Sequence, residues 1–300
     1  MFKRLLYATI LFIIIAVSAM FFWDARAFTI LTVNNSNAGG DITVLVLGKA
    51  GAGSEAGKWN NARELTDSIV LVKYTALDNT VQLISIPRDL YGNFGGETFK
   101  VNEVLVKNKI QALLDKLPEI TGISTDKFIV VDLGIIKHAV DALGGLDINL
   151  PEAVTDSVSG YTVPAGPHHF NGDDVVWLVR NRFSNEGDFF REKNQHLVIQ
   201  ELAKKFADLN FTERMRLFFT LAPDINSLQT NVSWGSFFPK TSALGSLKFK
   251  SVVLDFTTGL FTASNMPYGI GVQYVLIPKA GIDNYKDIKD FIALSLQSFH

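Results

Sequence analysis

DSIVLVKYTALDNTVQLISIPRD, residues 67–89, is the stretch of this chain that decides the fold class. Two runs rich in apolar and β-branched residues, 67–75 and 80–86, flank an Asp-Asn pair at 78–79. Two such runs joined by a short polar turn are typical of a β-hairpin, in which neighbouring strands are antiparallel. The sequence therefore predicts an antiparallel pair of strands at the centre of the fold.

The residues on either side of this hairpin predict strands that alternate with helices. Residues 41–47 read as a buried strand that ends at Gly48. Further strands are predicted at 127–132, 147–150, 249–256 and 272–277, and helices at 102–117, 134–143, 171–180, 186–208, 212–221, 232–244 and 284–298. Alternation of this kind predicts an α/β fold, here a single α/β/α sandwich whose central sheet is mixed because it includes the hairpin.

The N-terminus predicts a membrane anchor. Residues 5–23 run for 19 positions without a charge, which matches the length of a membrane-spanning helix, and Lys3 and Arg4 before them favour a cytoplasmic N-terminus. A cleaved signal peptide is the alternative, because Ala25-Arg26-Ala27 resembles a cleavage site. The predicted organisation is a cytoplasmic N-terminus at 1–4, a transmembrane helix at 5–23, a linker at 24–40 and one extracytoplasmic domain at 41–300.

Composition excludes several functional classes. The 300 residues carry a net charge of −2 and no Cys. No broad basic surface for nucleic acid is expected, and disulfides and thiolate metal sites are excluded. The five His residues show no metal-ligand spacing, and neither a Walker A pattern nor a G-x-S-x-G elbow occurs.

A cluster of arginines gives the clearest chemical signal. Arg180 and Arg182 end one predicted helix, and Asp188, Arg191 and Gln195 are spaced i, i+3, i+7 on the next, so that these three share a face. Guanidinium groups bind phosphate oxygens in bidentate fashion, and an Asp between them could orient an arginine, hold a metal or take a proton. The alternative is a solvated helix with local Asp–Arg pairs.

Four further positions could join this cluster. Arg88 and Asp89 follow Pro87, which ends a strand, and functional residues often lie at the C-terminal ends of strands in open α/β sheets. Lys100 follows a glycine-rich loop, and Asp67 opens a strand where it could bind a divalent cation. Each also has a structural alternative, such as a local ion pair or a turn.

Taken in order, these stretches resemble the LytR-CpsA-Psr family of bacterial cell-envelope phosphotransferases. The resemblance rests on DITVLVLG at 41–48, LTDSIVLV at 65–72, LISIPRDLY at 83–91, KVNEV at 100–104, VVDLGIIKHAVDALGGLDINLP at 130–151 and VRNRFSNEGDFFREKNQ at 179–195. Such enzymes move a glycopolymer from a polyprenyl-pyrophosphate carrier to a hydroxyl of peptidoglycan outside the cell. The resemblance implies those two partners, membrane attachment and Mg²⁺ as cofactor.

The resemblance also implies roles for individual residues. It implies that the pyrophosphate is bound by five cations: Arg88, Lys100, Arg180, Arg182 and Arg191. It gives Gln195 a polar place in the same pocket and gives Asp67 the role of a Mg²⁺ ligand. Asp89 and Asp188 would serve catalysis or fix the arginines, so that the catalytic set is Arg88, Asp89, Arg182 and Asp188. An apolar tunnel for the prenyl chain is also implied.

Three positions depart from the family pattern. Leu65 stands where Arg is common, Lys49 and Ala50 stand where an Asp is common, and Asn194 replaces an Arg before the Gln. Glu55 or Glu64 could replace the metal ligand that is lost. Two other functions remain open: a membrane-anchored, non-enzymatic binder or regulator of lipid-linked anionic polymers, and a polyprenyl-pyrophosphate hydrolase.

Overall fold

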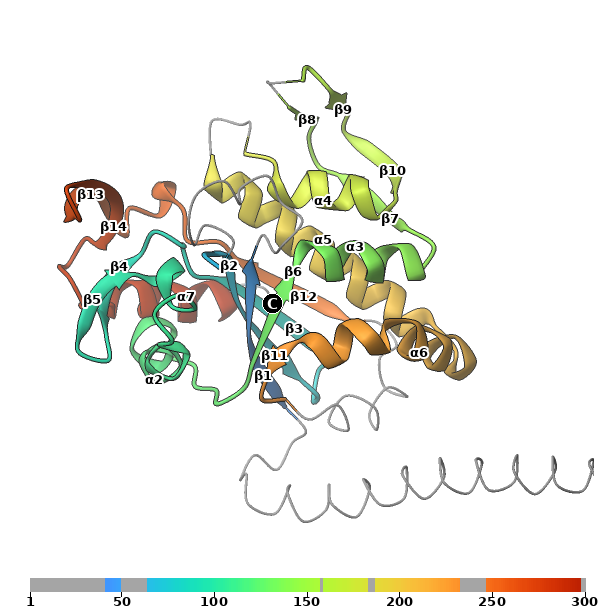
Figure 1. The fold of residues 1–300 in the computed structure, drawn as a ribbon, viewed down its shortest axis with the longest axis horizontal. Helices are drawn as coiled ribbons and strands as arrows, with labels where there is room; N and C mark the ends of the chain where they lie inside the picture. The colour runs from blue at the N-terminus through green and yellow to red at the C-terminus, as the bar shows by residue number, and fades with distance from the viewer. Residues whose placement is uncertain (1–40, 50–63, 157–158, 183–186, 233–246, 298–300) are drawn as a thin grey trace, which may run out of the picture.

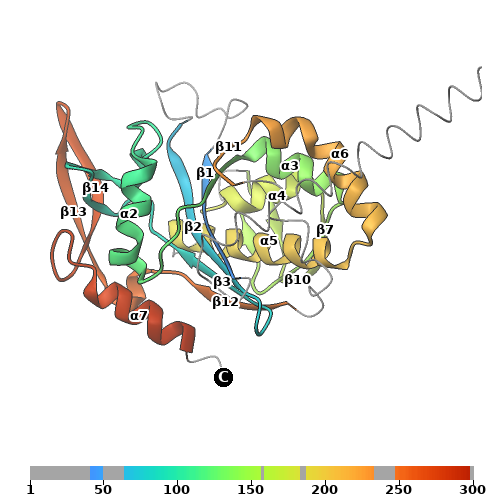
Figure 2. The same cartoon turned by 90° about the horizontal axis from the view of Figure 1, so that it is seen from below.

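A central sheet lies between two groups of helices in the computed structural model, which describes residues 41–49, 64–156, 159–182, 187–232 and 247–297 (Figures 1 and 2). On one side lie α3 (Leu133–Ala142), α4 (Gly172–Arg180), α5 (Asp188–Asp208) and α6 (Phe211–Ser227). On the other side lie α2 (Ile110–Thr121) and α7 (Lys286–Gln297).

The sheet is mixed, as predicted. Its six strands run in the order β11 (Gln229–Thr230), β6 (Phe128–Asp132), β1 (Ile42–Lys49), β2 (Thr66–Thr75), β3 (Thr80–Ser85) and β12 (Lys248–Val252). β1 is parallel to β6 and antiparallel to β2, while β3 is antiparallel to β2 and parallel to β12. The antiparallel hairpin at the centre is therefore confirmed.

Alternation along β2 and β3 gives the sheet two buried faces. Leu71 and Ile84 are paired and contribute to the core that α2 and α7 cover. Val70 and Leu83 belong to a separate cluster, against which Ile199 of α5 packs. Because successive side chains of a strand point to opposite faces, the last residue of β3, which pairs with Val70, faces the α5 side.

The smaller strands form separate two-stranded sheets outside the central sheet. Four two-stranded sheets pair β4 (Tyr91–Phe94) with β5 (Glu97–Lys100), β7 (Leu146–Leu150) with β10 (Gly166–Phe170), β8 (Val154–Thr155) with β9 (Thr162–Val163), and β13 (Phe261–Tyr268) with β14 (Gly271–Pro278). Two short 3-10 helices, η2 (Val101–Glu103) and η5 (Phe256–Thr258), complete the described elements. His168 and His169 both belong to β10.

The helix predicted at 102–117 starts later than its apolar pattern indicated. Only residues 101–103 are helical before Ile110, as the 3-10 helix η2. Asn108 has φ 55°, in the left-handed region, which an α-helix does not accommodate. The α-helix therefore begins after this residue and continues to Gly122, whose φ of 76° suits a C-terminal glycine.

Helix α4 begins and ends close to where the sequence predicted it. The Asn171 side chain accepts hydrogen bonds from the backbone N–H groups of Asp173 and Asp174, and the Asp174 carboxylate accepts one from the N–H of Asn171. This capping box starts the helix where the sequence placed it. The helix predicted at 232–244 falls almost entirely outside the described residues.

None of the helices in the described ranges is long and apolar enough to cross a bilayer. The predicted membrane segment at 5–23 and the linker at 24–40 lie outside those ranges.

Candidate functional site

Arg88 is the centre of a cluster of charged side chains at one end of the sheet. Its Nη1 donates to Asp67 Oδ1 of β2 at 2.6 Å, and its Nε donates to Asp188 Oδ2 of α5 at 2.6 Å. The turn after β3 places Arg88 between these two carboxylates, because Pro87 ends the strand and the chain turns there. The guanidinium is thus held from two sides in one orientation.

Two more arginines contact the same carboxylates. Arg182 Nε lies 3.2 Å from Asp188 Oδ1, and Arg182 Nη2 lies 3.7 Å from Asp67 Oδ1. Arg191 Nη1 lies 3.5 Å from Asp188 Oδ1, and its Nη2 donates to the backbone carbonyl of Asp67 at 2.9 Å. The structure therefore brings together three arginines that the sequence separates by up to about a hundred positions.

Asp89 and Lys100 form the neighbouring pair. Lys100 Nζ donates to Asp89 Oδ1 at 2.9 Å, and Asp89 Oδ2 lies 3.8 Å from Arg88 Nε. The backbone N–H of Leu276, on β14, donates to the carbonyl of Asp89 and so fixes β14 against this edge. These side chains and the three arginines are called the cation cluster below: Asp67, Arg88, Asp89, Lys100, Arg182, Asp188 and Arg191.

The cation cluster carries an excess of one positive charge, from four basic and three acidic groups. Burial lowers the pKa of Arg88, but the charges of Asp188, Asp89 and Asp67 outweigh it and leave that pKa raised. Burial raises the pKa of Asp188, but the arginines outweigh it and leave that pKa lowered. Arg88 and Asp188 are therefore both charged near neutral pH.

The three arginines differ in how far they reach the surface. The side chain of Arg182 is 43% exposed and that of Arg88 22%, whereas that of Arg191 is only 2% exposed. Burial, followed by the charges of Arg182 and Arg88, lowers the pKa of Arg191 to about 10. Arg182 and Arg88 are thus the cations that an anion in solvent would meet, and Arg191 supports them from below.

The structure describes no ion pair or hydrogen bond between the cation cluster and two residues predicted for the site, Arg180 and Gln195. Arg180, the last residue of α4, is exposed and forms no ion pair with the cation cluster in the part of the chain that the structure describes. Gln195 donates from its amide to the carbonyl of Val179 at 3.3 Å, so it ties α5 to α4. The prediction from a shared helix face is therefore confirmed for the contact between Asp188 and Arg191, whereas no contact between Gln195 and the cations is described.

The described residues show no ligand set for Mg²⁺, and the predicted cofactor stays a prediction. Asp67 Oδ1 is already held by Arg88, and the described ranges contain no group of three or more His, Asp or Glu side chains that could hold a metal. At the end of β1, where a second carboxylate would be needed, Lys49 stands instead and binds Glu64 at 2.8 Å. Because Mg²⁺ prefers carboxylate and water oxygens, this basic environment disfavours it. Glu55 lies outside the described residues.

Sequence reasoning missed a buried polar group beneath the cation cluster. Ser85, Glu192 and His196 are all less than 5% exposed. Burial raises the pKa of Glu192 to about 8 and lowers that of His196 to about 4. The only signal in the sequence was the i, i+4 spacing of Glu192 and His196 on α5, which also fits a solvated helix face.

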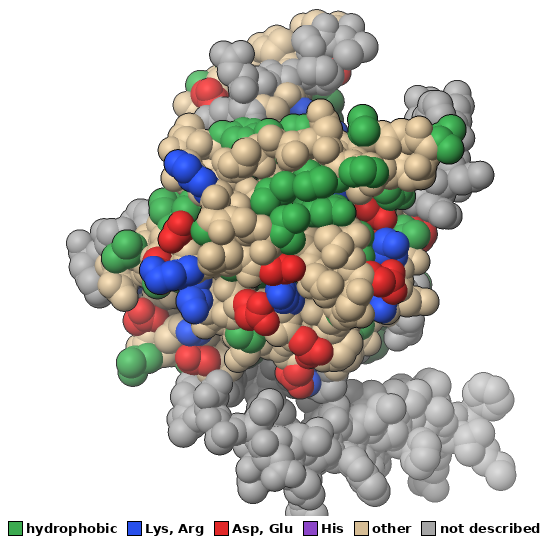
Figure 3. Space-filling view, turned by 90° about the vertical axis from the view of Figure 1, so that its left-hand side faces the viewer, with side chains coloured by type: hydrophobic (Ala, Val, Ile, Leu, Met, Phe, Trp, Pro, Cys, Tyr) green, Lys and Arg blue, Asp and Glu red, His purple; other side chains and the backbone are tan. Residues whose placement is uncertain are grey.

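The hairpin of β13 and β14 adds apolar surface beside the charged groups. Burial and the charges of Asp89 and Asp188 raise the pKa of Tyr274, so its hydroxyl lies within their field and is uncharged. Figure 3 looks onto the side of the molecule that carries this hairpin and shows hydrophobic side chains gathered there. Tyr268, Ile270 and Val272 of the hairpin are exposed. Nothing in the sequence linked this late hairpin to Asp89.

Comparison with known proteins gives a consistent result. The model of the LytR_cpsA_psr family matches residues 23–278. The Staphylococcus aureus (strain COL) protein named Regulatory protein MsrR is 29% identical over 209 residues, which are 65% of this chain and 61% of that protein. The Bacillus subtilis (strain 168) protein named Polyisoprenyl-teichoic acid--peptidoglycan teichoic acid transferase TagU is 24% identical over 232 residues, 72% of each chain.

The fold is also shared with solved structures. A structure described as TagT bound to LIIa-WTA has a TM-score of 0.62 and 19% identity, and the match covers 88% of this chain and 94% of that one. The family model spans most of the chain, including the stretches that carry Arg88, Arg182 and Asp188. The chain belongs to the LytR-CpsA-Psr family.

Proposed function

We propose that this chain transfers a glycopolymer phosphate from a polyprenyl-pyrophosphate carrier to a hydroxyl of peptidoglycan during cell-wall assembly. The observation that carries the proposal is the arrangement of Arg88 and Arg182, which are partly exposed and fixed by Asp67 and Asp188. Fixed guanidinium groups with a net positive charge suit a pyrophosphate, because its several oxygens can accept bidentate hydrogen bonds. Membership of a family that includes a teichoic acid transferase supports the choice of reaction.

The main requirement of this reaction is that the site neutralises negative charge on the phosphates. The acceptor hydroxyl oxygen forms a bond to the phosphorus that carries the glycan, the bond from that phosphorus to the bridging oxygen breaks, polyprenyl phosphate leaves, and the hydroxyl proton is released to water. Negative charge develops on the leaving phosphate, and Arg88 and Arg182 are placed to stabilise it. Asp67 and Asp188 hold the two guanidinium groups in place, which lowers the cost of organising them.

The carrier's prenyl chain needs apolar contacts. The exposed apolar side chains belong to the β13–β14 hairpin, which also carries Tyr274, and the charges of Asp89 and Asp188 act on that tyrosine. The hairpin therefore supplies apolar surface beside the charged site. The tunnel implied by the resemblance stays a prediction. We place the domain outside the cell membrane, attached by the apolar segment at 5–23, because that attachment holds the domain close to a lipid-linked substrate.

A second candidate is a non-enzymatic binder or regulator of lipid-linked anionic polymers. It is favoured by the Lys49–Glu64 pair, which stands where a metal-binding carboxylate would be needed, and by the name of the relative MsrR. The cation cluster would bind a pyrophosphate in either case. The two candidates therefore differ in turnover and not in binding.

The test is the mass of the products formed by the full-length chain in detergent or vesicles. The chain is incubated with a short polyprenyl-pyrophosphate glycan, with and without peptidoglycan oligomers. Transfer predicts a glycan phosphate joined to peptidoglycan only when the acceptor is present. Release of polyprenyl phosphate without an acceptor would indicate a hydrolase, and saturable binding without any product would indicate a binding protein.

A further inference from the structure

A buried carboxyl group lies directly beneath the cation cluster. Glu192 follows Arg191 on α5, is 4% exposed, and its Oε2 has no hydrogen-bond partner in the described structure. The charged groups that face it are Arg191 and Asp188 of its own helix and Arg88 after β3. The Ser85 hydroxyl, at the end of β3, is its described hydrogen-bond partner. A charge on Glu192 would therefore act on the arginines of the site.

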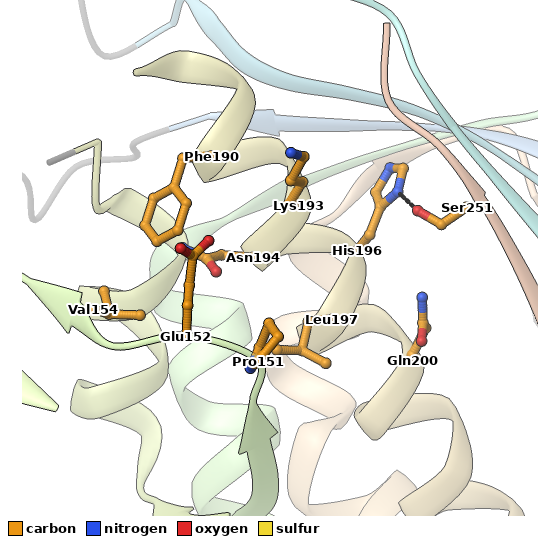
Figure 4. Close-up of a pocket in the computed structure, with 10 residues that line it drawn as sticks. All are labelled: Pro151, Glu152, Val154, Phe190, Lys193, Asn194, His196, Leu197, Gln200 and Ser251. Atoms are coloured by element: carbon orange, nitrogen blue, oxygen red, sulfur yellow. Dashed lines mark hydrogen bonds between the residues drawn. The ribbon is translucent and has the colours of Figure 1, made fainter. Parts of the chain in front are cut away.

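A chain of hydrogen bonds leads from this carboxyl to an exposed serine that lines a cavity. Ser85 Oγ lies 2.8 Å from His196 Nε2, and His196 Nδ1 lies 2.5 Å from Ser251 Oγ on β12. Ser251 is exposed and lines a cavity of about 210 Å³, together with His196 (Figure 4). The buried carboxyl is thus linked through Ser85, His196 and Ser251 to this cavity.

Only one member of this chain changes charge near neutral pH. Burial lowers the pKa of His196 to about 4, so the imidazole is neutral, and one of its nitrogens donates while the other accepts. Burial is also the main influence on Glu192 and raises its pKa to about 8, while the charge of Arg191 opposes the change. The carboxyl is therefore neutral at neutral pH and ionises in mildly alkaline solution.

The charge of Glu192 decides whether the site has a net positive charge. The cation cluster has an excess of one positive charge, which an ionised Glu192 would cancel. We propose that Glu192 is a proton-controlled charge switch: the protonated carboxyl leaves the cluster positive and able to hold a pyrophosphate, and the carboxylate neutralises the cluster and weakens its hold. This inference rests on the proposed function and adds the way in which the affinity of that site is controlled.

Linkage gives the switch a second, independent signature. If deprotonation of Glu192 weakens anion binding, then anion binding must favour protonation of Glu192 by the same factor. Pyrophosphate that binds at about pH 8 should therefore cause proton uptake by the protein. The sign is diagnostic, because a bound pyrophosphate beside arginines would itself lose protons and not gain them.

The experiment measures binding of inorganic pyrophosphate to the full-length chain by calorimetry between about pH 6.5 and about pH 9, in buffers of different ionisation enthalpy. The affinity of the wild-type chain should fall about tenfold more over this range than that of Glu192→Gln, which has no carboxylate to form. Proton uptake should accompany binding in the wild type and be absent in Glu192→Gln. Glu201→Gln is the matched control, since Glu201 lies on the same helix but pairs with Lys204.

Each outcome decides the matter. A wild-type pH profile that matches that of Glu192→Gln, without proton uptake, overturns the switch while leaving the site intact. No binding by the wild type at any pH overturns the proposed function itself. If Glu192→Gln does not fold, the wild type still decides: net proton uptake at about pH 8 supports the switch, and a wild-type affinity for pyrophosphate that does not fall between about pH 6.5 and about pH 9 contradicts it.

Discussion

Arg88 and Asp188 lie 100 positions apart in the chain, and Nε of the first lies 2.6 Å from Oδ2 of the second. The contact joins the end of β3 to the first residue of α5. Asp188 also lies within ion-pair distance of Arg182 and Arg191, so one carboxylate orients three guanidinium groups. The proposed function depends on this carboxylate more than on any other single group of the cluster.

Replacing Asp188 with Asn should therefore impair turnover without unfolding the domain. The amide keeps the size but loses the charge that holds the arginines, and a hydrogen bond to a charged group contributes about 1.5–3 kcal/mol, which corresponds to roughly a 10- to 100-fold loss of rate. Asp208→Asn, at the exposed other end of α5, is the control and should keep the wild-type rate. Equal rates in the two variants, with equal melting temperatures, would remove Asp188 from the site.

Most of this cluster could be predicted from the sequence, since Asp67, Arg88 and Asp188 stand at positions that local rules locate. Strand ends, a proline stop and helical spacing each fix one of them. The same rules included Arg180 and Gln195, for which the described residues show no ion pair or hydrogen bond with the cation cluster. A difference of one or two residues at the end of α4 decides whether an arginine meets the carboxylates, and boundaries of that kind depend on tertiary packing.

A metal ion should not stabilise the protein on its own. Because Lys49 binds Glu64 and Arg88 holds Asp67, addition of Mg²⁺ at millimolar concentration without substrate should leave the melting temperature unchanged. Differential scanning fluorimetry with and without a chelator measures this. A rise of several degrees on adding Mg²⁺ would show a resident site and would draw its remaining ligands from residues outside the described ranges, such as Glu55.

Glu192 should also make stability depend on pH. Its pKa is raised to about 8 in the folded chain, so the folded state keeps a proton that the unfolded state has lost. The contribution of Glu192 to the free energy of unfolding is therefore fully present below about pH 4.5 and is lost as the pH rises through about 8. Glu192→Gln should raise the melting temperature relative to wild type at about pH 8 and not at about pH 5, at roughly 2–4 °C per kcal/mol. A difference that does not change with pH would show that this carboxyl is not titrating.

His196 should limit stability at acid pH. Its pKa is lowered to about 4 by burial, so the unfolded chain binds a proton that the folded chain does not, and stability falls as the pH drops from about 6.5 to about 4. His196→Gln removes the titrating ring and keeps hydrogen-bonding atoms near Ser85 and Ser251. Thermal unfolding at about pH 5 and about pH 7 should show a smaller drop for the variant than for the wild type. The idea fails if both lose the same amount.

The buried polar chain and Tyr274 could not have been predicted from sequence, for a physical reason. Ser85 and Ser251 meet His196 because β3 pairs in parallel with β12 and α5 covers that face, and the two serines lie 111 and 55 positions from His196 in the chain. The sequence alone does not distinguish a polar residue that faces solvent from one that is buried within the same strand or helix. Their partners become visible only when the register of the sheet is known.

The most direct test of the central claim compares Arg182→Ala with Arg180→Ala in the transfer assay. Both arginines lie at the end of α4, but only Arg182 meets Asp67 and Asp188. The proposed pyrophosphate site predicts that Arg182→Ala loses most of its rate of glycan-phosphate transfer to peptidoglycan, on the order of 100-fold, while Arg180→Ala stays close to wild type and both remain folded. Equal losses in the two variants, or no loss in Arg182→Ala, would contradict the claim that the cation cluster holds the substrate's pyrophosphate.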